Sequence, residues 1–295
     1  MVGEELPAIR LLGRRHLLRA IRRLYSWSRS DPVDEELRGW NWDRPPLKPR
    51  AYYELGVSEI ASKYCGTRRD VWLRRVAGAR GEATELLARG KAVHEAIALA
   101  YREVARWSAL GTEPWDIYER ARGSWKRAIG GLDAGTAALV ERVYKYTLLS
   151  LVGEMVNEEV VHGERQPPLA VSEVKVDGSS LGLSSSLSVD LLEGGVIVDF
   201  KYGAPRDFHK LSVAGYALAL EAEYEVPYDF GVLVYVTEWN GRLKAHARPI
   251  YVNSYLRRWF VDERDAIIDM LVEGREPPRD AQCNPACPFR RVCAP

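Results

Sequence analysis

The segment VDLLEGGVIVDFKYG, residues 189–203, decides the fold that we predict for this chain. Short runs of valine, isoleucine and leucine flank its glycine pair, Gly194-Gly195. Two adjacent glycines favour the left-handed backbone of a two-residue hairpin turn, and aliphatic runs of this length are typical of buried strands. The segment therefore predicts two antiparallel strands joined by a tight turn.

Further strands and helices are predicted on both sides of this hairpin. Residues 169–203 break at Asp177-Gly178 as well as at the glycine pair, which predicts a meander of three strands joined by tight turns. A second hairpin is predicted around Asn240-Gly241, the favoured pair for a two-residue turn. The elements predicted after the meander are a helix, two strands and a last helix, over residues 206–223, 230–239, 242–252 and 253–274.

The first half of the chain is predicted to be helical. Ser58 is a candidate N-cap, and apolar residues recur at helical spacing with Leu86, Val93, Ile97 and Tyr101 on one side of a long helix. Helices are predicted over residues 59–76, 83–107, 114–129 and 134–158, after an irregular connector over 30–55. Helices beside a set of strands predict an α/β protein.

Charge and composition narrow the possible partners. The 295 residues include 42 basic and 41 acidic residues, so only local clusters of charge bear on nucleic-acid binding. One such cluster lies in residues 1–30 and permits a basic helix, which either binds a phosphate backbone or is simply a solvated face. Its arginines are Arg10, Arg14, Arg15, Arg19, Arg22, Arg23 and Arg29.

Nothing in the sequence predicts a membrane partner. No apolar run approaches the roughly 20 residues that a membrane helix needs. The N-terminal stretch is interrupted by arginines and lacks the apolar centre of a signal peptide, so we expect a cytoplasmic protein. Many Arg and Glu with few Asn and Gln are typical of a thermophile.

Charged residues in the central hairpin predict a metal site. Asp199 and Lys201 are two residues apart, so they leave the same face of a strand, and Asp190 can lie opposite them across the turn. Paired carboxylates among apolar residues are costly unless a cation lies between them. A divalent metal ion is one such cation, and His94 on a predicted helix is a candidate fourth participant. The alternatives are a surface ion pair for Asp199 and Lys201 and an ordinary core or surface residue for His94. Glu173, on the strand before Asp190, either joins this site or pairs with a surface cation.

The four cysteines predict a second site. Cys65 stands alone, whereas Cys283, Cys287 and Cys293 lie within eleven residues of a tail whose prolines disfavour regular structure. Four thiolates are the number that an iron-sulfur cluster or a structural zinc ion requires. The arrangement of one plus three favours iron-sulfur, and two disulfides are the remaining alternative.

Taken in order, these motifs resemble a known family. The order is Cys65 with an arginine-rich helix, Gly90 to His94, Asp190, Asp199 with Lys201, a helix containing Tyr216 to Glu221, and three C-terminal cysteines. This order is similar to the RecB-type iron-sulfur nucleases of the PD-(D/E)xK superfamily, and most similar to the CRISPR-associated Cas-four exonucleases. The basic N-terminal extension and the length suggest the archaeal type I-A branch.

The resemblance implies a fold with four parts. These are a basic N-terminal extension and connector, a helical region with the first cluster cysteine and the motif histidine, a RecB-like nuclease core with a mixed central sheet flanked by helices, and a cysteine tail. Their predicted bounds are residues 1–55, 56–165, 166–275 and 276–295.

The resemblance also implies a role for each motif residue. His94, Asp190, Asp199 and the backbone carbonyl of Phe200 would bind Mn²⁺ or Mg²⁺, and Lys201 would orient the attacking water. Tyr216 would lie on a helix that lines the DNA path. The four cysteines would hold a 4Fe-4S cluster of structural function. Candidate DNA-binding residues are Arg68, Arg69, Arg74, Arg75, His209 and Lys210.

Three functions are compatible with these motifs. The leading hypothesis is a metal-dependent exonuclease that acts on single-stranded DNA ends in CRISPR adaptation, before integrase proteins insert the DNA. A repair nuclease of the same chemistry is the second. The third is a DNA-binding subunit with little or no catalysis, because Ser212 stands where the family usually has glutamine.

Overall fold

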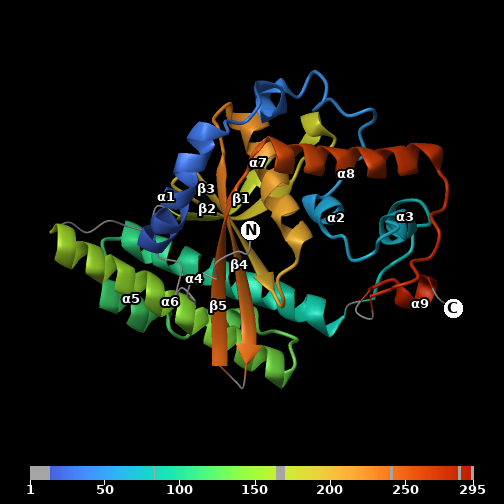
Figure 1. Ribbon diagram of the computed structural model, residues 1–295. Helices are drawn as coiled ribbons and strands as arrows, with labels where there is room; N and C mark the ends of the chain where they lie inside the picture. The colour runs from blue at the N-terminus through green and yellow to red at the C-terminus, as the bar shows by residue number, and fades with distance from the viewer. Residues whose placement is uncertain (1–13, 83, 164–169, 240–241, 285–286, 294–295) are drawn as a thin grey trace.

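A five-stranded sheet lies at the centre of the molecule, with helices on both faces (Figure 1). The computed structural model describes residues 14–82, 84–163, 170–239, 242–284 and 287–293. The strands lie in chain order and comprise β1 Ala170–Val176, β2 Leu187–Glu193, β3 Val196–Tyr202, β4 Phe230–Trp239 and β5 Arg242–Tyr251. All neighbours are antiparallel except β3 and β4, which are parallel. The expected α/β fold with a mixed sheet is therefore confirmed.

The central hairpin forms as predicted. Glu193 pairs with Val196, so Gly194 and Gly195 make the whole turn, with φ values of 55° and 83°. The second predicted hairpin is confirmed in its strands, since β4 and β5 pair along their full lengths. Its turn at Asn240-Gly241 lies outside the described residues.

One face of the sheet is covered by long helices from the first half of the chain. These are α4 Glu85–Ala109, α5 Pro114–Ala121 and α6 Ala134–His162, with a 3-10 turn η3 Ser124–Ala128 between the last two. The side chains of Thr84 and Asp133 cap α4 and α6 by accepting backbone N–H groups of their first turns. The predicted apolar side of α4 is correct for Val93, Ile97 and Tyr101, but Leu86 is exposed.

The other face is covered by α7 Lys210–Tyr224, which connects β3 to β4, and by α8 Ser254–Glu273. Two short helices, α2 Val57–Ala61 and α3 Arg69–Arg75, pack beside them. Short 3-10 turns complete this side, namely η1 Glu35–Leu37, η2 Gly39–Asn41, η4 Ser179–Leu181 and η5 Asp207–His209. The predicted connector over 30–55 thus contains η1 and η2.

The two ends of the chain pack onto this frame. Helix α1, Arg14–Ser30, contacts β5 and buries Ile21 and Leu24, while Arg22 and Arg23 are exposed. The predicted Arg10 lies outside the described residues. The tail ends in a four-residue helix, α9 Arg290–Cys293, which the expectation of an irregular tail missed.

Three local predictions are wrong. The helix predicted over 114–129 is not continuous, because α5 ends at Ala121 and residues 124–128 form η3. The helix predicted over 59–76 is interrupted between α2 and α3, where Arg68 adopts a left-handed backbone with φ of 61°, and Gly56 rather than Ser58 precedes α2 as its N-cap. The turn predicted at Asp177-Gly178 is instead a longer loop that contains η4. That loop is held by a bridge between Leu55 and Leu183, a contact between distant segments that local sequence does not reveal.

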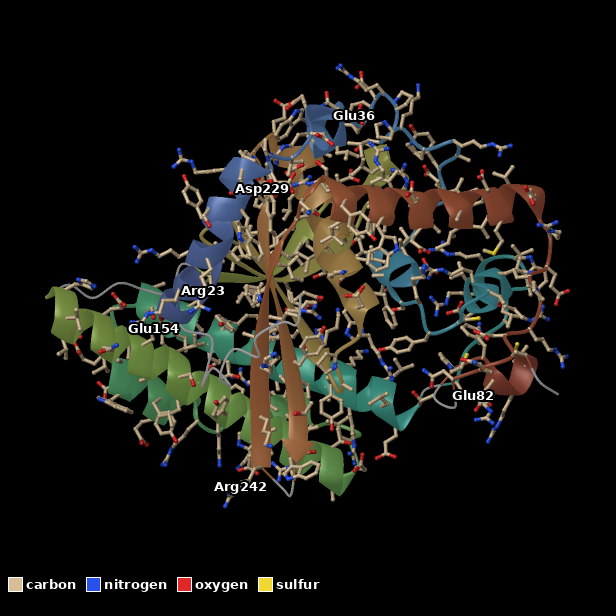
Figure 2. The ribbon with its side chains drawn as sticks, viewed as in Figure 1. Arg23, Glu36, Glu82, Glu154, Asp229 and Arg242 are labelled. Carbon is tan, nitrogen blue, oxygen red and sulfur yellow. The ribbon has the colours of Figure 1, made fainter. Side chains whose placement is uncertain are left out.

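A buried ion network joins the connector over residues 30–55 to α7 and α8. Arg257 and Glu221 are both 0% exposed in their side chains, and the guanidinium donates to both carboxylate oxygens at 2.6 and 2.8 Å. Arg38 donates to Glu221 and to Asp229, which Figure 2 labels near the upper end of the sheet. Because each buried charge has an oppositely charged partner, the network fixes the relative positions of η2, α7 and α8.

Candidate functional site

The two strands of the central hairpin, β2 and β3, stop pairing next to Asp190 and Asp199. The pairing of β2 with β3 ends at Leu191 and Val198. The side that β2 buries changes there, because Val189 packs into the core beneath α7 whereas Leu191 packs into the core beneath α4. Asp190 lies between these two residues and reaches groups on the α4 side of the sheet.

Asp190 is held by a helix and by the neighbouring strand. Its Oδ2 lies 3.1 Å from Nδ1 of His94 on α4, and it accepts the backbone N–H of Phe200 at 2.8 Å. Burial opposes ionisation, but the hydrogen bond and charge of His94, together with Lys201, hold the pKa of Asp190 below its ordinary value. The same contact outweighs burial at His94 and raises the pKa of that imidazole.

Asp199 is held by its own strand and by α7. Its side chain is 3% exposed, and Lys201 Nζ lies 2.6 Å from Oδ2 and 2.9 Å from Oδ1. The hydroxyl of Ser212 lies 2.6 Å from Oδ2. Burial raises the pKa of Asp199, Lys201 opposes that rise, and the negative charge of Asp190 reinforces it. The two carboxylates are therefore close enough to influence each other, and their environments push their pKa values in opposite directions.

A cavity of about 250 Å³ opens beside this cluster. His94, Asp190 and Phe200 line it, together with residues of α4 and β1. Glu173 also lines it but forms an ion pair with Arg102, so it takes the surface-cation alternative rather than joining the carboxylates.

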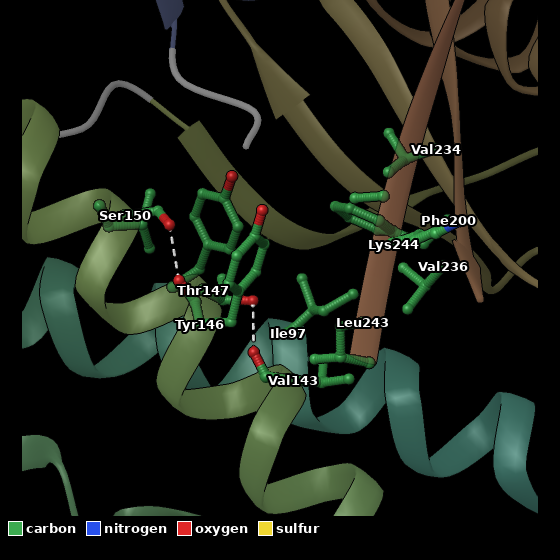
Figure 3. Close-up of a pocket in the computed structure, with 13 residues that line it drawn as sticks. Ile97, Val143, Tyr146, Thr147, Ser150, Phe200, Val234, Val236, Leu243 and Lys244 are labelled. Atoms are coloured by element: carbon green, nitrogen blue, oxygen red, sulfur yellow. Dashed lines mark hydrogen bonds between the residues drawn. The ribbon is translucent and has the colours of Figure 1, made fainter. Parts of the chain in front are cut away.

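A smaller cavity of about 50 Å³ lies between α4, α6 and the end of β4 and β5 (Figure 3). Its wall is mostly apolar. Its hydroxyls are already used within α6, where Thr147 donates to the carbonyl of Val143 and Ser150 to that of Tyr146. Its ionisable lining residues are Tyr101, Tyr146 and Lys244, whereas His94, Asp190 and Glu173 line the larger cavity. The larger cavity is therefore the candidate site.

Two predicted DNA-binding residues, His209 and Lys210, lie at the start of α7. His209 is 6% exposed and lies between the hydroxyls of Tyr64 and Tyr235, at 3.0 and 3.3 Å. Burial and the charges of Lys201 and Arg206 lower the pKa of His209 to about 4. Its role in DNA binding stays a prediction. Lys210, the other DNA-binding candidate here, forms an ion pair with Asp207 and lies over the ring of Trp259.

Tyr216 lies on α7, facing the carboxylates. It packs against the core on that side of the sheet. Burial raises its pKa, and the charges of Asp199 and Asp190 raise it further. Tyr216 is therefore a neutral phenol close to the cluster.

The four cysteines meet at a second, smaller cavity. Cys65 lies in the loop between α2 and α3, and the tail brings Cys283, Cys287 and Cys293 to the same small cavity. No disulfide joins any two of these four described cysteines. Burial raises the pKa of Cys287, and the neighbouring Cys283 and Cys65 add to that effect.

Contacts besides the thiols hold the tail in place. Asp280 accepts the backbone N–H of Gly66 at 2.6 Å, and the carbonyl of Pro288 accepts that of Glu82 at 2.8 Å. Arg69 hydrogen-bonds Cys293 as well as Glu276.

The donor types at the two sites suit the predicted cofactors. Two carboxylates, an imidazole and a backbone carbonyl suit Mn²⁺ or Mg²⁺, and four thiols suit a cluster or zinc. Within the described ranges, no three His, Cys, Asp or Glu side chains have the spacing of a finished metal site. At the carboxylates the reason is visible, because Lys201 and Ser212 engage Asp199 whereas His94 and Phe200 engage Asp190.

Comparison with known proteins shows the family of this chain. Residues 12–295 match the family described as CRISPR-associated exonuclease Csa1. The chain belongs to that family. A Csa1 protein of Thermoproteus tenax is 33% identical over 269 residues, which cover 88% of this chain and 91% of the relative. One of Saccharolobus solfataricus is 33% identical over 286 residues, covering 89% and 93%.

In this Csa1 family member, the arginines beside Cys65 have intramolecular partners. Arg68 is 8% exposed and donates to the carbonyls at the end of α2 and to Glu263. Arg74 and Arg75 pair with Glu59, and Arg69 pairs with the tail. These contacts hold α2, α3 and the tail together, and the role of the four arginines in DNA binding stays a prediction.

The sequence did not predict the contacts of two residues, Ser212 and Glu221. Ser212 was treated as a departure, although its place one turn before Tyr216 on the same helix was a signal that its hydroxyl faces the site. Glu221 was quoted as part of a motif, and the structure gives it the buried partner Arg257. The described residues also include no helix with the length and apolar character needed to cross a membrane.

Proposed function

We propose that this protein is a metal-dependent DNA exonuclease that acts on single-stranded ends in CRISPR adaptation. The observation that carries the proposal is the cluster of His94, Asp190, Asp199 and Lys201 beside an open cavity. Membership in a family described as CRISPR-associated exonucleases supports the nuclease activity and favours CRISPR over repair. The ordered motifs support a RecB-like, Cas-four-related core of the type I-A branch.

The chemistry required for phosphodiester cleavage matches the groups that this cluster provides. Bound Mn²⁺ or Mg²⁺ would supply an activated water and relieve charge on the phosphate. His94, Asp190, Asp199 and the Phe200 carbonyl are the groups that would hold it. Lys201 would supply a cation to the negative charge that develops on the phosphate, and burial would strengthen that interaction.

The cysteine site fits a 4Fe-4S cluster held by Cys65, Cys283, Cys287 and Cys293. We propose a structural role for it, because the site joins the loop before α3 to the end of the chain. Cys287→Ser is expected to lose iron and the brown absorbance of anaerobically purified protein. Retention of full iron with wild-type absorbance in that variant would contradict the assignment, and zinc in place of iron would select the zinc alternative.

The first experiment is degradation of end-labelled single-stranded DNA in Mn²⁺ by anaerobically purified protein. Lys201→Ala and Asp199→Ala should each lower the cleavage rate by about 100-fold or more, the scale of losing one preorganised electrostatic group. Lys175→Ala, which removes an exposed lysine from β1, is the matched control and should cleave like the wild type.

The results separate the candidate functions. Loss of cleavage in both variants but not in the control supports an active nuclease with this site. DNA binding without turnover by wild type, in Mn²⁺ and in Mg²⁺, favours the noncatalytic subunit of a complex with integrase proteins. Unchanged cleavage by Asp199→Ala would mean that the reaction occurs elsewhere.

A further inference from the structure

One face of the hairpin of β4 and β5 continues directly from the candidate site. Lys201 on β3 pairs with Tyr235 on β4, and Tyr235 pairs with His246 on β5, so the three residues form one row across the sheet. The two strands then extend beyond β3, whose last paired residue, Tyr202, faces Val236. Figure 1 shows β4 and β5 as the longest strands.

This face is basic and carries an exposed tryptophan. Side chains alternate along a strand, so Thr237 and Trp239 of β4 share the face of Tyr235, as do the paired residues Lys244 and Arg242 of β5. Trp239 is 64% exposed, and the ammonium of Lys244 lies 5.5 Å from its ring centroid. Figure 2 labels Arg242 at the far end of β5.

The opposite face of the same hairpin is already occupied. Leu243 and Ala247 pack into the core beneath α4 and α6, and Glu238 pairs with Arg142 of α6. By contrast, Arg242, Lys244 and Arg248 are all exposed, and no described residue forms an ion pair with them. The residues of this face from Tyr235 onward include no acidic side chain.

We infer that this face, the basic ribbon formed by Trp239, Arg242, Lys244, His246 and Arg248, binds single-stranded DNA next to the candidate site. Cations that follow a phosphate backbone, combined with an exposed aromatic ring on which a base stacks, are the features that bind single strands without sequence preference. Duplex DNA presents its bases stacked and inaccessible to Trp239. The inference deepens the proposed function by naming the surface that selects single strands.

The test is fluorescence anisotropy of a labelled single-stranded oligonucleotide with the full-length protein in EDTA, measured over a series of salt concentrations. The double variant Arg242→Gln/Lys244→Gln should flatten the slope of log K against log salt by about 1.4, since each lost phosphate contact removes about 0.7. Trp239→Ala should weaken binding about tenfold at every salt concentration without changing the slope.

Matched controls use equally exposed residues elsewhere. Lys175→Gln removes a cation from β1, at the other edge of the sheet, and Trp115→Ala removes a tryptophan of α5 that is 55% exposed. Both should bind like wild type. Wild-type affinity in the ribbon variants, or equal losses for duplex and single strands with no effect of Trp239→Ala, would overturn the inference. Because EDTA removes the catalytic metal, a protein that binds as expected but never cleaves DNA refutes the proposed nuclease and leaves the ribbon intact.

Discussion

The hydroxyl of Ser212 on α7 lies 2.6 Å from the buried carboxylate of Asp199 on β3. The same hydroxyl lies 2.7 Å from the backbone carbonyl of His209, which fixes its position at the start of the helix. A short side chain at this position therefore holds the carboxylate directly. The serine that stands in place of the family's usual glutamine is part of the site rather than a gap in it.

Ser212→Ala tests that role. The variant leaves Asp199 with Lys201 as its remaining side-chain partner, and losing a group that orients a metal ligand typically costs 10- to 100-fold in metal affinity or activity, so we expect about that loss in Mn²⁺-dependent cleavage. Metal titration of the cleavage rate measures it. Ser26→Ala is the control, because that hydroxyl only donates to the carbonyl of Arg23 within exposed α1. Cleavage at the wild-type rate and Mn²⁺ dependence would show that Ser212 is a mere packing residue.

The buried pair of Arg257 and Glu221 predicts a large stability effect. Arg257→Met leaves the Glu221 carboxylate buried with its principal partner removed, and breaking a buried pair in this way costs about 3–5 kcal/mol. The exposed pair of Arg50 and Asp269 provides the contrast, since Arg50→Met should cost at most about 1 kcal/mol. Denaturant unfolding of both variants gives the comparison, and similar losses in the two would refute a structural role for the network.

His209 predicts an acid-sensitive component of stability. Its pKa is about 4 in the folded protein, below the ordinary value of 6.5, because burial and the cations Lys201 and Arg206 disfavour its charged form. The unfolded chain therefore binds this proton first, and stability falls as pH drops from about 6.5 to about 4. With solvent screening taken into account, we expect a loss of roughly 2 kcal/mol.

Urea unfolding of wild type and His209→Gln at pH 7 and pH 4 isolates this component. Glutamine keeps a polar group between Tyr64 and Tyr235 but takes up no proton. The wild type should lose more stability than the variant over this range. An equal loss in both proteins would assign the acid sensitivity to other groups.

Sequence alone predicted the parts of this fold that local patterns determine. The Gly194-Gly195 turn follows from the backbone freedom of glycine, and the long helices follow from apolar spacing. The break between α2 and α3 was missed because it depends on Arg68, whose guanidinium is satisfied by carbonyls of α2 and by distant Glu263. A buried arginine and an exposed one are identical in a sequence, so neither this break nor the Arg257 pair could be predicted.

The same reasoning applies to the candidate site. Alternation on β3 correctly predicted that Asp199 and Lys201 are neighbours. It did not predict that Asp190 lies where β2 changes the side that it buries, so that His94 contacts Asp190 while Asp199 is held from α7. That division depends on the end of strand pairing, which is a property of the assembled sheet.

Two glycines in long helices predict opposite effects of the same substitution. A methyl group at Gly215 of α7 would lie 2.5 Å from the ring of Phe260 on α8, and Val57 closes the other side at 3.2 Å. Gly215→Ala should therefore separate α7 from α8 and destabilise the protein by about 1–3 kcal/mol. At Gly153 of α6, a methyl group would meet nothing within 4 Å, so Gly153→Ala should stabilise by about 0.5–1 kcal/mol through the entropy of the unfolded chain. Thermal unfolding of the two variants in one buffer measures the loss of stability in the first and the gain in the second.

Because α7 also carries Ser212, Gly215→Ala should slow Mn²⁺-dependent cleavage at temperatures where the variant is fully folded, whereas Gly153→Ala should cleave like wild type. A destabilised Gly215→Ala variant with unchanged cleavage would mean that the position of α7 against α8 does not govern how Asp199 is held.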